Sequence, residues 1–143
     1  MTPPDHPAPS PADLQAALQE LFAPWVQDLG LRVEAAPEPG VVLARLPVNP
    51  RLAREGGTLC GQAMLSAADT VMVLALIHHF KGFRPCTTVQ QSSSFLRPLS
   101  GQDLRVEARV LRAGKTLAFG EIDLRGADDG RSVCRISSTC ALL

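Results

Sequence analysis

The sequence predicts an α+β fold in which one long central helix is wrapped by an antiparallel β-sheet of about five to six strands. The helix is predicted from Gln62 to His79, because these residues are apolar on every side and are therefore expected to be buried on every side. The sheet is predicted from residues 104–142, where apolar and polar residues alternate between short turns. In a chain of 143 residues, only such a sheet can surround the helix.

The composition describes one compact domain and excludes several classes of protein. The 14 Lys and Arg residues balance 14 Asp and Glu residues, the pI is about 6.8, and no basic run is present. A nucleic-acid partner is therefore not expected. The four cysteines form neither a C-x-x-C pair nor a zinc-spaced cluster with histidine, so no metal and no cofactor is expected.

The N-terminal segment and the longest apolar stretch bear on location. Residues 1–10 are rich in proline and are expected to form a disordered arm, with residues 11–143 as a single domain. The arm lacks a basic segment followed by an apolar one, so it does not resemble a secretory signal, and a cytoplasmic protein is expected. The stretch from Ala63 to Ile77 is shorter than the ~20 residues that a bilayer needs and contains Asp69, so no membrane partner is expected.

The N-terminal part is expected to contain one helix and a hairpin. Ser10 is a good N-cap and Pro11 suits the first helical position, and apolar residues then recur every three or four positions as far as Trp25. The segments that follow are predicted to be a strand at 31–36, a turn at 37–40, a second strand at 41–48 and a loop at 49–60.

The C-terminal half is expected to supply the rest of the sheet. Residues 87–96 carry hydroxyls and amides on both faces, which leaves two interpretations open. The segment is either an ordinary polar edge strand or a strand that pairs with its copy in a dimer and lines a polar substrate channel. The remaining segments predict a meander, with strands at 104–111, 116–125 and 131–142 and turns at 113–115 and 128–130.

Asp69 is the leading candidate for chemistry, because it lies in the middle of the apolar helix. A carboxylate there costs several kcal/mol to bury unless it is paired or faces a cavity. Gln62, Ser66 and Thr70 fall with it within about a third of the helix circumference, which predicts a polar stripe facing a cavity. The alternative is a structural aspartate that is hydrogen-bonded to a neighbouring strand.

Gly61 is the second candidate, because it stands at the start of the same helix. Backbone N–H groups without partners point outward there, and they can polarise a carbonyl or hold an oxyanion. The alternative is a glycine needed only for a tight turn. Gly61 and Asp69 are eight residues apart, about 12 Å along a helix, so they can act on one carbonyl only if they come from two copies of the chain.

Other candidate residues are weaker. His78 and His79 close the helix, where the dipole favours a solvated structural role. Cys60 precedes the helix without an identifiable His or carboxylate partner, and the serines at 92–94 show no nucleophile elbow. Neither a cysteine nor a serine nucleophile is therefore expected.

Three segments together resemble a known family. They are G57-T-L-C-G-Q-A-M-L-S-A-A-D69-T, T88-V-Q-Q-S-S-S-F-L-R-P98 and G101-Q-D-L-R-V-E-A-R-V-L-R-A-G-K115. Over roughly residues 40–142 the chain resembles the hotdog-fold acyl-CoA thioesterases of the phenylacetate-degradation type, which are relatives of 4-hydroxybenzoyl-CoA thioesterase. The hotdog fold that this resemblance implies agrees with the fold that the periodicity predicts.

The resemblance implies roles for specific residues. In the family, an Asp or Glu on the central helix attacks the thioester or activates water, and a glycine N–H at the helix start polarises the carbonyl. These positions correspond to Asp69 and Gly61, and the family arranges them across a dimer interface, commonly in tetramers. Basic residues near the strand ends and the meander turn contact coenzyme A in such enzymes, which indicates Arg97 and Lys115.

The chain departs from the family's usual pattern N-x-x-G-x-x-H-G-G. Arg54, Cys60 and Gln62 stand where that pattern has Asn, His and the second Gly. Loss of the Asn removes a hydrogen bond that would position water or the carbonyl, and the amide of Gln62 is a candidate replacement.

The expected function is hydrolysis of the thioester of an aromatic or short- to medium-chain acyl-CoA, at a site between the chains of a homodimer or homotetramer. Substrate-binding roles are expected for Gln62, Ser66, Thr70, Arg97 and Lys115. The alternative is a hotdog module that binds an acyl-CoA or another acyl ligand without catalysis. A hydratase is a third possibility, but the Asp/His pair that such enzymes use is not found.

Overall fold

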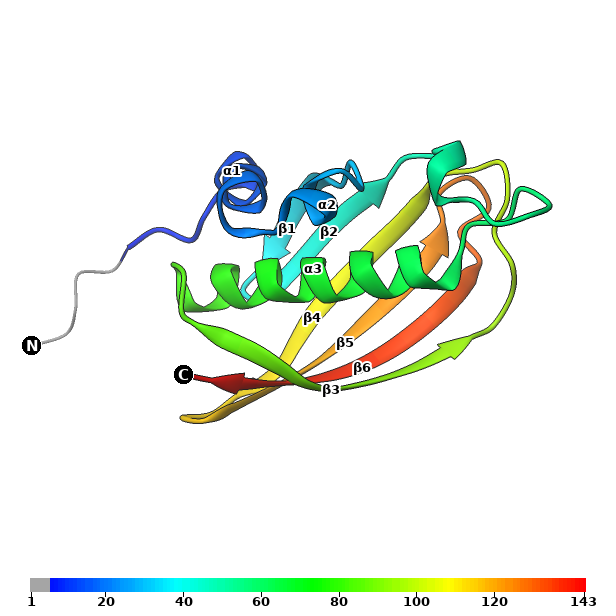
Figure 1. Cartoon of the computed structure of the whole chain (residues 1–143). Coiled ribbons are helices and arrows are strands. Elements are labelled where there is room, and N and C mark those ends of the chain that lie inside the picture. Colours follow the sequence, from blue (N-terminus) through cyan, green and yellow to red (C-terminus); the bar gives the residue numbers. More distant parts are fainter. Residues whose placement is uncertain (1–5) are drawn as a thin grey trace, which may run out of the picture.

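A computed structural model describes residues 6–143, in which one long helix lies across one face of a six-stranded sheet (Figure 1). The helices are α1 (Pro11–Leu21), α2 (Pro24–Gln27), α3 (Gly61–Phe80) and a short 3-10 helix, η1 (Pro50–Leu52). The strands are β1 (Arg32–Glu38), β2 (Val41–Leu46), β3 (Cys86–Phe95), β4 (Leu104–Ala113), β5 (Leu117–Gly126) and β6 (Ser132–Leu142). Of the predicted arm at 1–10, residues 1–5 lie outside the described residues, and residues 6–10 have no regular secondary structure.

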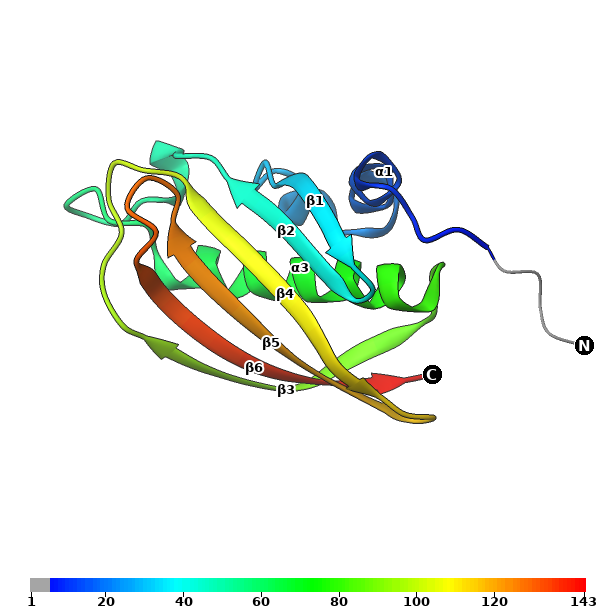
Figure 2. The ribbon, with the colours of Figure 1, turned by 180° about the vertical axis from the view of Figure 1, so that it is seen from behind.

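The sheet has the strand order β1-β2-β4-β5-β6-β3, and every neighbouring pair is antiparallel. Strands β4, β5 and β6 form the predicted meander, and α3 connects β2 on one side of it to β3 on the other (Figure 2). Strand β3 is therefore a free edge of the sheet. This arrangement confirms the predicted α+β hotdog fold.

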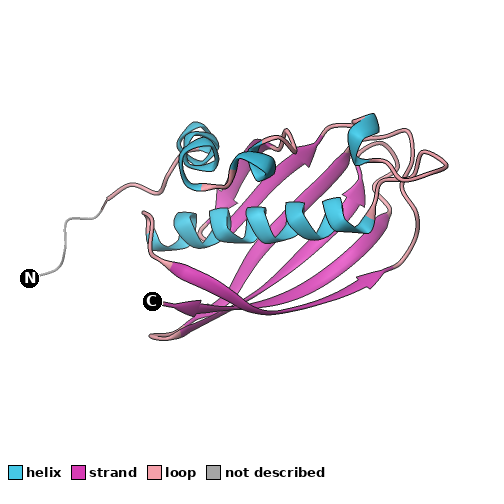
Figure 3. Ribbon diagram, in the orientation of Figure 1, coloured by secondary structure: helices cyan, strands magenta, loops and turns pink. Residues whose placement is uncertain are grey.

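The long loops gather at the end of the sheet where α3 begins (Figure 3). These loops are residues 47–60, which lead from β2 into α3, and residues 96–103, which lead from β3 into β4. Two backbone hydrogen bonds fix the last residues before the helix, from Leu59 N–H to the Leu99 carbonyl and from Cys60 N–H to the Leu52 carbonyl, each at 2.9 Å. The start of α3 is thus held in place by two segments that are far apart in the sequence.

Helix α3 forms the core, but it is not buried on every side. Its buried residues pack against β2, β4 and β5 on the concave face of the sheet, and α1 covers part of another side. Leu65, Asp69 and Val73, which are four positions apart, remain only half-buried. The prediction of burial on every side is therefore wrong for a single chain, because one sheet and one short helix leave a stripe of α3 uncovered.

By length and composition alone, α3 is apolar enough to cross a membrane. However, 67% of its most apolar window is buried within the fold, which is the behaviour of a core helix. The burial agrees with the core role predicted from the sequence.

Several boundaries in the N-terminal part differ from the prediction. Ser10 does cap α1, since its hydroxyl accepts from Asp13 N–H and the Asp13 carboxylate accepts from Ser10 N–H. The helix ends at Leu21 rather than continuing to Trp25, because Pro24 cannot donate a helical hydrogen bond and instead starts α2. Strand β1 runs through the predicted turn to Glu38, and β2 stops at Leu46, two residues early.

His78 is not solvated, contrary to the prediction. Its side chain is buried, and its Nδ1 accepts a hydrogen bond of 3.2 Å from Gly40 N–H in the turn between β1 and β2. Gly40 has a positive φ of 73°, and an added Cβ there would lie 3.1 Å from Val110 on β4 and 3.4 Å from Nδ1 of His79 on α3. The turn therefore fits closely against β4 and the end of α3. The structural role predicted for His78 is confirmed, while His79 is the exposed residue of the pair.

We expect His78 to make the stability of the fold depend on pH. Burial, and then the neighbouring His79, lower the pKa of His78 below its usual 6.5, so the folded protein resists a proton that the unfolded chain accepts. The free energy of unfolding should therefore fall as the pH falls through 6.5, by at most about 1.4 kcal/mol per pH unit.

Chemical denaturation between about pH 7.5 and pH 5.5 tests this expectation. His78→Asn keeps an acceptor for Gly40 N–H but does not titrate, so its stability should change less with pH than that of the wild type. His79→Asn is the matched control and should keep the slope. An unchanged slope in His78→Asn would show that another group titrates.

Candidate active site

The start of α3 presents backbone donors that have no partner inside the helix. Gly61 is the first helical residue, and its N–H, like those of the next residues in the first turn, has no acceptor one turn earlier. Cys60 is the N-cap and makes no capping hydrogen bond with its side chain. These N–H groups, together with the positive end of the helix dipole, favour a carbonyl oxygen or an anion at this position.

Gly61 opens onto a cavity of about 450 Å³ that also contains Arg54 and Arg97. The structure thus brings together two of the predicted site residues, Gly61 and Arg97, and adds Arg54. The ring of Phe95, at the end of β3, packs against Gly61, where an added Cβ would lie 3.3 Å from it. An uncharged backbone donor and two guanidinium groups therefore share one space that has room for a negatively charged ligand.

Asp69 lies two turns further along α3 and faces β3. It is half-buried, and its Oδ1 accepts a hydrogen bond of 2.8 Å from the hydroxyl of Thr88. In residues 6–143 no hydrogen bond is found for Oδ2, and this atom is not buried. The bond from Thr88 fits the structural alternative for Asp69, but it engages one carboxylate oxygen and leaves the other available for chemistry.

Thr88 was not singled out from the sequence, and a β-bulge is the reason that it reaches Asp69. The pairing of β3 with β6 shifts between Thr88 and Gln90, so Val89 is an extra residue in β3. Thr88 faces α3 before the bulge, and Gln91 and Phe95 face it after the bulge. A regular alternation starting at Thr88 would instead turn Phe95 away from Gly61. A sequence prediction that assumes strict alternation along the strand therefore does not show that the residues after Val89 change face.

Asp69 also influences the thiols beside it. Burial raises the pKa of Cys86 on β3, and electrostatic interactions with the neighbouring Cys140 and Asp69 raise this pKa further. The Cys86 thiol therefore stays protonated near neutral pH and is not an activated nucleophile.

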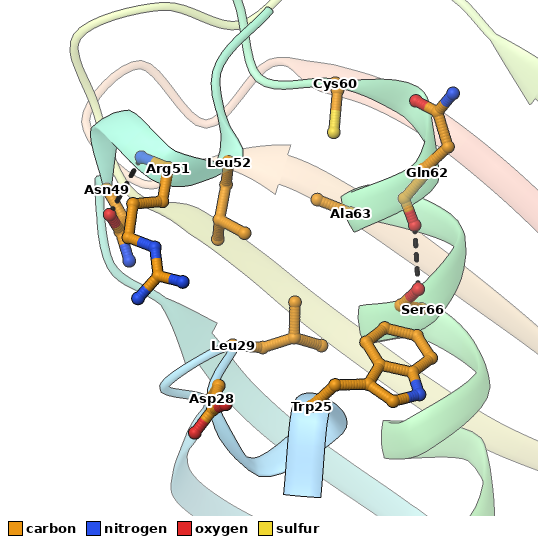
Figure 4. A pocket seen from close by; sticks show the side chains of 10 residues that line it. All are labelled: Trp25, Asp28, Leu29, Asn49, Arg51, Leu52, Cys60, Gln62, Ala63 and Ser66. Carbon is orange, nitrogen blue, oxygen red and sulfur yellow. Dashed lines mark hydrogen bonds between the residues drawn. The ribbon is translucent and has the colours of Figure 1, made fainter. Parts of the chain in front are cut away.

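The predicted polar stripe on α3 is divided between different surroundings. Gln62 and Ser66 line a second cavity of about 320 Å³, and the Ser66 hydroxyl donates to the Gln62 carbonyl at 2.8 Å (Figure 4). Thr70 is buried, and its hydroxyl donates to the Ser66 carbonyl at 2.7 Å. Hydroxyls of helical Ser and Thr commonly bond back to the preceding turn in this way. Thr70 therefore does not reach either cavity in the single chain.

The second cavity lies beside the N-terminal half of α3 and is mainly apolar. Leu29, Leu52 and the thiol of Cys60 point into it, and the ring of Trp25 stands across it next to Ser66 (Figure 4). Because Cys60 lines this cavity and Gly61 lines the first one, the two cavities lie on either side of the start of α3. A ligand held by Gly61 N–H therefore has polar space on one side and apolar space on the other.

Lys115 lies away from this region. Its carbonyl accepts a hydrogen bond of 3.0 Å from Arg84, which follows the C-terminal end of α3. Within one chain, the predicted pair of basic residues is thus separated by the length of the helix, with Arg97 near the start of α3 and Lys115 near its end.

Comparisons with known proteins agree with the fold and identify the family. The sequence model of the Thioesterase superfamily matches residues 56–133. Human acyl-coenzyme A thioesterase 13 is 30% identical over 98 residues, which cover 68% of this chain and 69% of that protein. The conserved protein PA5202 from Pseudomonas aeruginosa has a similar structure, with a TM-score of 0.79 and 29% identity over 89% of this chain and 99% of that one. Zebrafish thioesterase superfamily member 2 shares the fold, with a TM-score of 0.83 and 24% identity over 94% of this chain and 99% of that one.

The match to the superfamily includes the residues that build the candidate site. Residues 56–133 begin in the loop before α3 and contain Gly61, Asp69 and Thr88. The resemblance noted in the sequence is confirmed by this match and by the similar structures. The chain belongs to the Thioesterase superfamily and is a thioester hydrolase.

Proposed function

We propose that the protein hydrolyses the thioester of an aromatic or short- to medium-chain acyl-CoA at a site shared by two copies of the chain. The observation that carries this proposal is the start of α3, where Gly61 N–H opens onto a cavity lined by Arg54 and Arg97. Asp69, with one free carboxylate oxygen, lies eight residues further along the same helix.

The position of the two groups on one helix supports a shared site. Eight residues of α-helix span about 12 Å, whereas a group that attacks a carbonyl carbon and a donor to the same carbonyl oxygen must lie within a few ångströms of each other. Gly61 of one copy and Asp69 of another therefore form the proposed site together.

In the proposed reaction, Gly61 N–H donates to the thioester oxygen and stabilises the negative charge that develops on it. The free oxygen of Asp69 then acts in one of two ways. As a nucleophile, it attacks the carbonyl carbon, expels the coenzyme A thiolate and forms an anhydride that water hydrolyses. As a general base, it takes a proton from water, whose oxygen attacks the carbonyl carbon and expels the thiolate directly.

The two cavities suggest how the substrate is held. Arg54 and Arg97 supply positive charge for the phosphate groups of coenzyme A. The cavity beside Cys60, lined by Trp25 and leucine side chains, supplies apolar space for an acyl group, and Gln62 and Ser66 add polar contacts to it. Human acyl-coenzyme A thioesterase 13, which is 30% identical, supports the choice of an acyl-CoA as substrate.

A free edge and exposed apolar residues support the proposed dimer. Strand β3 ends the sheet, and its exposed residues include Val89 and Phe95, with Leu96 just beyond. The uncovered stripe of α3 lies beside this edge, since Thr88 on β3 contacts Asp69 on α3. Pairing of two β3 strands would extend the sheet and satisfy the unpaired edge.

We expect Val89→Lys to convert the protein to monomers and to abolish thioester hydrolysis, because a charge at the paired edge opposes association. Val48→Lys is a matched control, because Val48 is 57% exposed and Val89 is 56% exposed, but Val48 lies in the loop after β2. Sedimentation velocity and activity measurements on both variants test this expectation. A monomeric Val89→Lys protein with full activity would rule out a shared site.

Thiol release from a panel of aromatic and aliphatic acyl-CoAs tests the proposed function directly. Turnover of at least one thioester is expected from the wild type. Binding of acyl-CoAs without any turnover would instead favour a hotdog module that binds acyl ligands without catalysis.

A further inference from the structure

A line of polar side chains runs from Asp69 into the interior between α3 and the sheet. The Thr88 hydroxyl donates to Asp69 Oδ1 at 2.8 Å, and Thr88 Oγ1 is also 3.9 Å from the sulfur of Cys140. The same sulfur is 3.9 Å from the hydroxyl of Ser138. Cys140 and Ser138 are both buried, on the face of β6 that packs toward α3. These contacts therefore join side chains of β3 and β6 beside the helix.

The direction of each hydrogen bond in this line follows from the number of protons. A hydroxyl has one proton, and that of Thr88 is given to Asp69, so Thr88 Oγ1 can only accept from the Cys140 thiol. The thiol also has one proton, so its sulfur can only accept from the hydroxyl of Ser138. All three donors therefore point toward the carboxylate of Asp69.

The amide of Gln91 stands at the far end of this line. Gln91 lies directly across the β3–β6 ladder from Ser138, and its Nε2 is buried without a hydrogen-bond partner in the described residues. A buried N–H group without a partner is unusual. The oxygen of Ser138 is still free to accept, because its only proton is directed to Cys140, so Gln91 places a further donor at the end of the line that is farthest from Asp69.

We infer that Cys140 and Ser138 are positioning residues that fix Thr88 and, through it, the carboxylate of Asp69. The hydrogen bonds from Ser138 to Cys140, from Cys140 to Thr88 and from Thr88 to Asp69 together form a donor line. By holding Oδ1, this donor line sets the orientation of Asp69 and leaves Oδ2 as the oxygen that acts on the substrate. The inference rests on the proposed catalytic role of Asp69. It also assigns a function to a buried thiol that lines neither of the two cavities at the start of α3.

Cys134 provides a matched comparison within the same strand. It is buried on the same face of β6 as Cys140, but it lies opposite Phe95 rather than opposite Thr88. Burial, together with the charge of Asp123, raises the pKa of Cys134 to about 11, so this thiol stays protonated near neutral pH. Removing either thiol changes the core by one sulfur atom, but only Cys140 contacts Thr88.

We expect Cys140→Ala to lower kcat by roughly threefold to tenfold with little change in KM, as expected for loss of one hydrogen bond that orients the reacting group. Cys140→Ser keeps a donor and should recover part of this loss. Cys134→Ala should leave kcat within about twofold of the wild type. Equal kcat values for Cys140→Ala and Cys134→Ala would overturn the inference.

A spectroscopic measurement tests the donor line without relying on activity. The Raman S–H band of Cys140 is obtained as the difference between the wild type and Cys140→Ala. Thr88→Val removes the acceptor for this thiol, so the band should move to higher frequency, and an unmoved band would overturn the inference. If Asp69→Asn hydrolyses thioesters as fast as the wild type, the proposed function fails instead, and the Raman result still decides whether the donor line exists.

Discussion

We expect Asp69→Asn to lower kcat for the best acyl-CoA substrate by at least about a hundredfold, because it removes the proposed nucleophile or general base. The substitution changes the volume of the side chain very little, and the amide oxygen still accepts the hydrogen bond from Thr88. Release of free thiol at saturating acyl-CoA measures the effect, and KM should change much less than kcat.

The control for this variant is a second carboxylate that lies outside the site. Glu121 is exposed on the opposite face of the sheet, so Glu121→Gln should keep full activity. The melting temperature of Asp69→Asn should stay close to that of the wild type. An active but unstable Asp69→Asn protein would mean that Asp69 is the structural aspartate of the alternative interpretation.

We expect Gly61→Pro to lower kcat by about a hundredfold to a thousandfold, because proline has no N–H to donate to the thioester oxygen. Proline is well suited to the first position of a helix, where the N–H has no helical acceptor. The preceding residue, Cys60, has φ −73° and ψ 149°, an extended conformation that proline requires before it. The backbone can therefore accept this substitution.

Gly61→Ala is the control that isolates the N–H group. Both substitutions add a Cβ atom, which would lie 3.3 Å from the ring of Phe95, so alanine reproduces the crowding that this atom causes. Alanine keeps the N–H, and its kcat should remain much higher than that of Gly61→Pro. Equal losses in the two variants would show that crowding against Phe95, rather than loss of the donor, is responsible.

Much of the fold could be predicted because its two main signals are local. The apolar stretch around Ala67 and the alternation after Leu104 each indicate one element and its burial, and the observed α3 and β4 agree with them. The errors arose where a single residue changes the backbone. Pro24 divides the first helix, and the residues around Pro37 continue the strand β1 instead of turning.

The candidate site was predicted only in part, because its geometry depends on contacts between distant segments. Gly61 and Asp69 were found from their places on one helix. Thr88 was missed because the bulge at Val89 decides which residues of β3 face the helix, and a bulge leaves no clear mark in the sequence. The buried position of His78 was missed for a similar reason, since it depends on a turn 38 residues earlier.

The central claim is that Gly61 of one chain and Asp69 of another form one site, and mixed dimers test it most directly. Dimers that contain one Asp69→Asn chain and one Gly61→Pro chain have one site with both changes and one site with neither. The account predicts that a random mixture of the two inactive proteins, after subunit exchange, recovers about a quarter of wild-type activity, since about half of the dimers are mixed and each has one intact site. No recovery in dimers shown to be mixed would contradict the account, because it would place both groups of each site on the same chain.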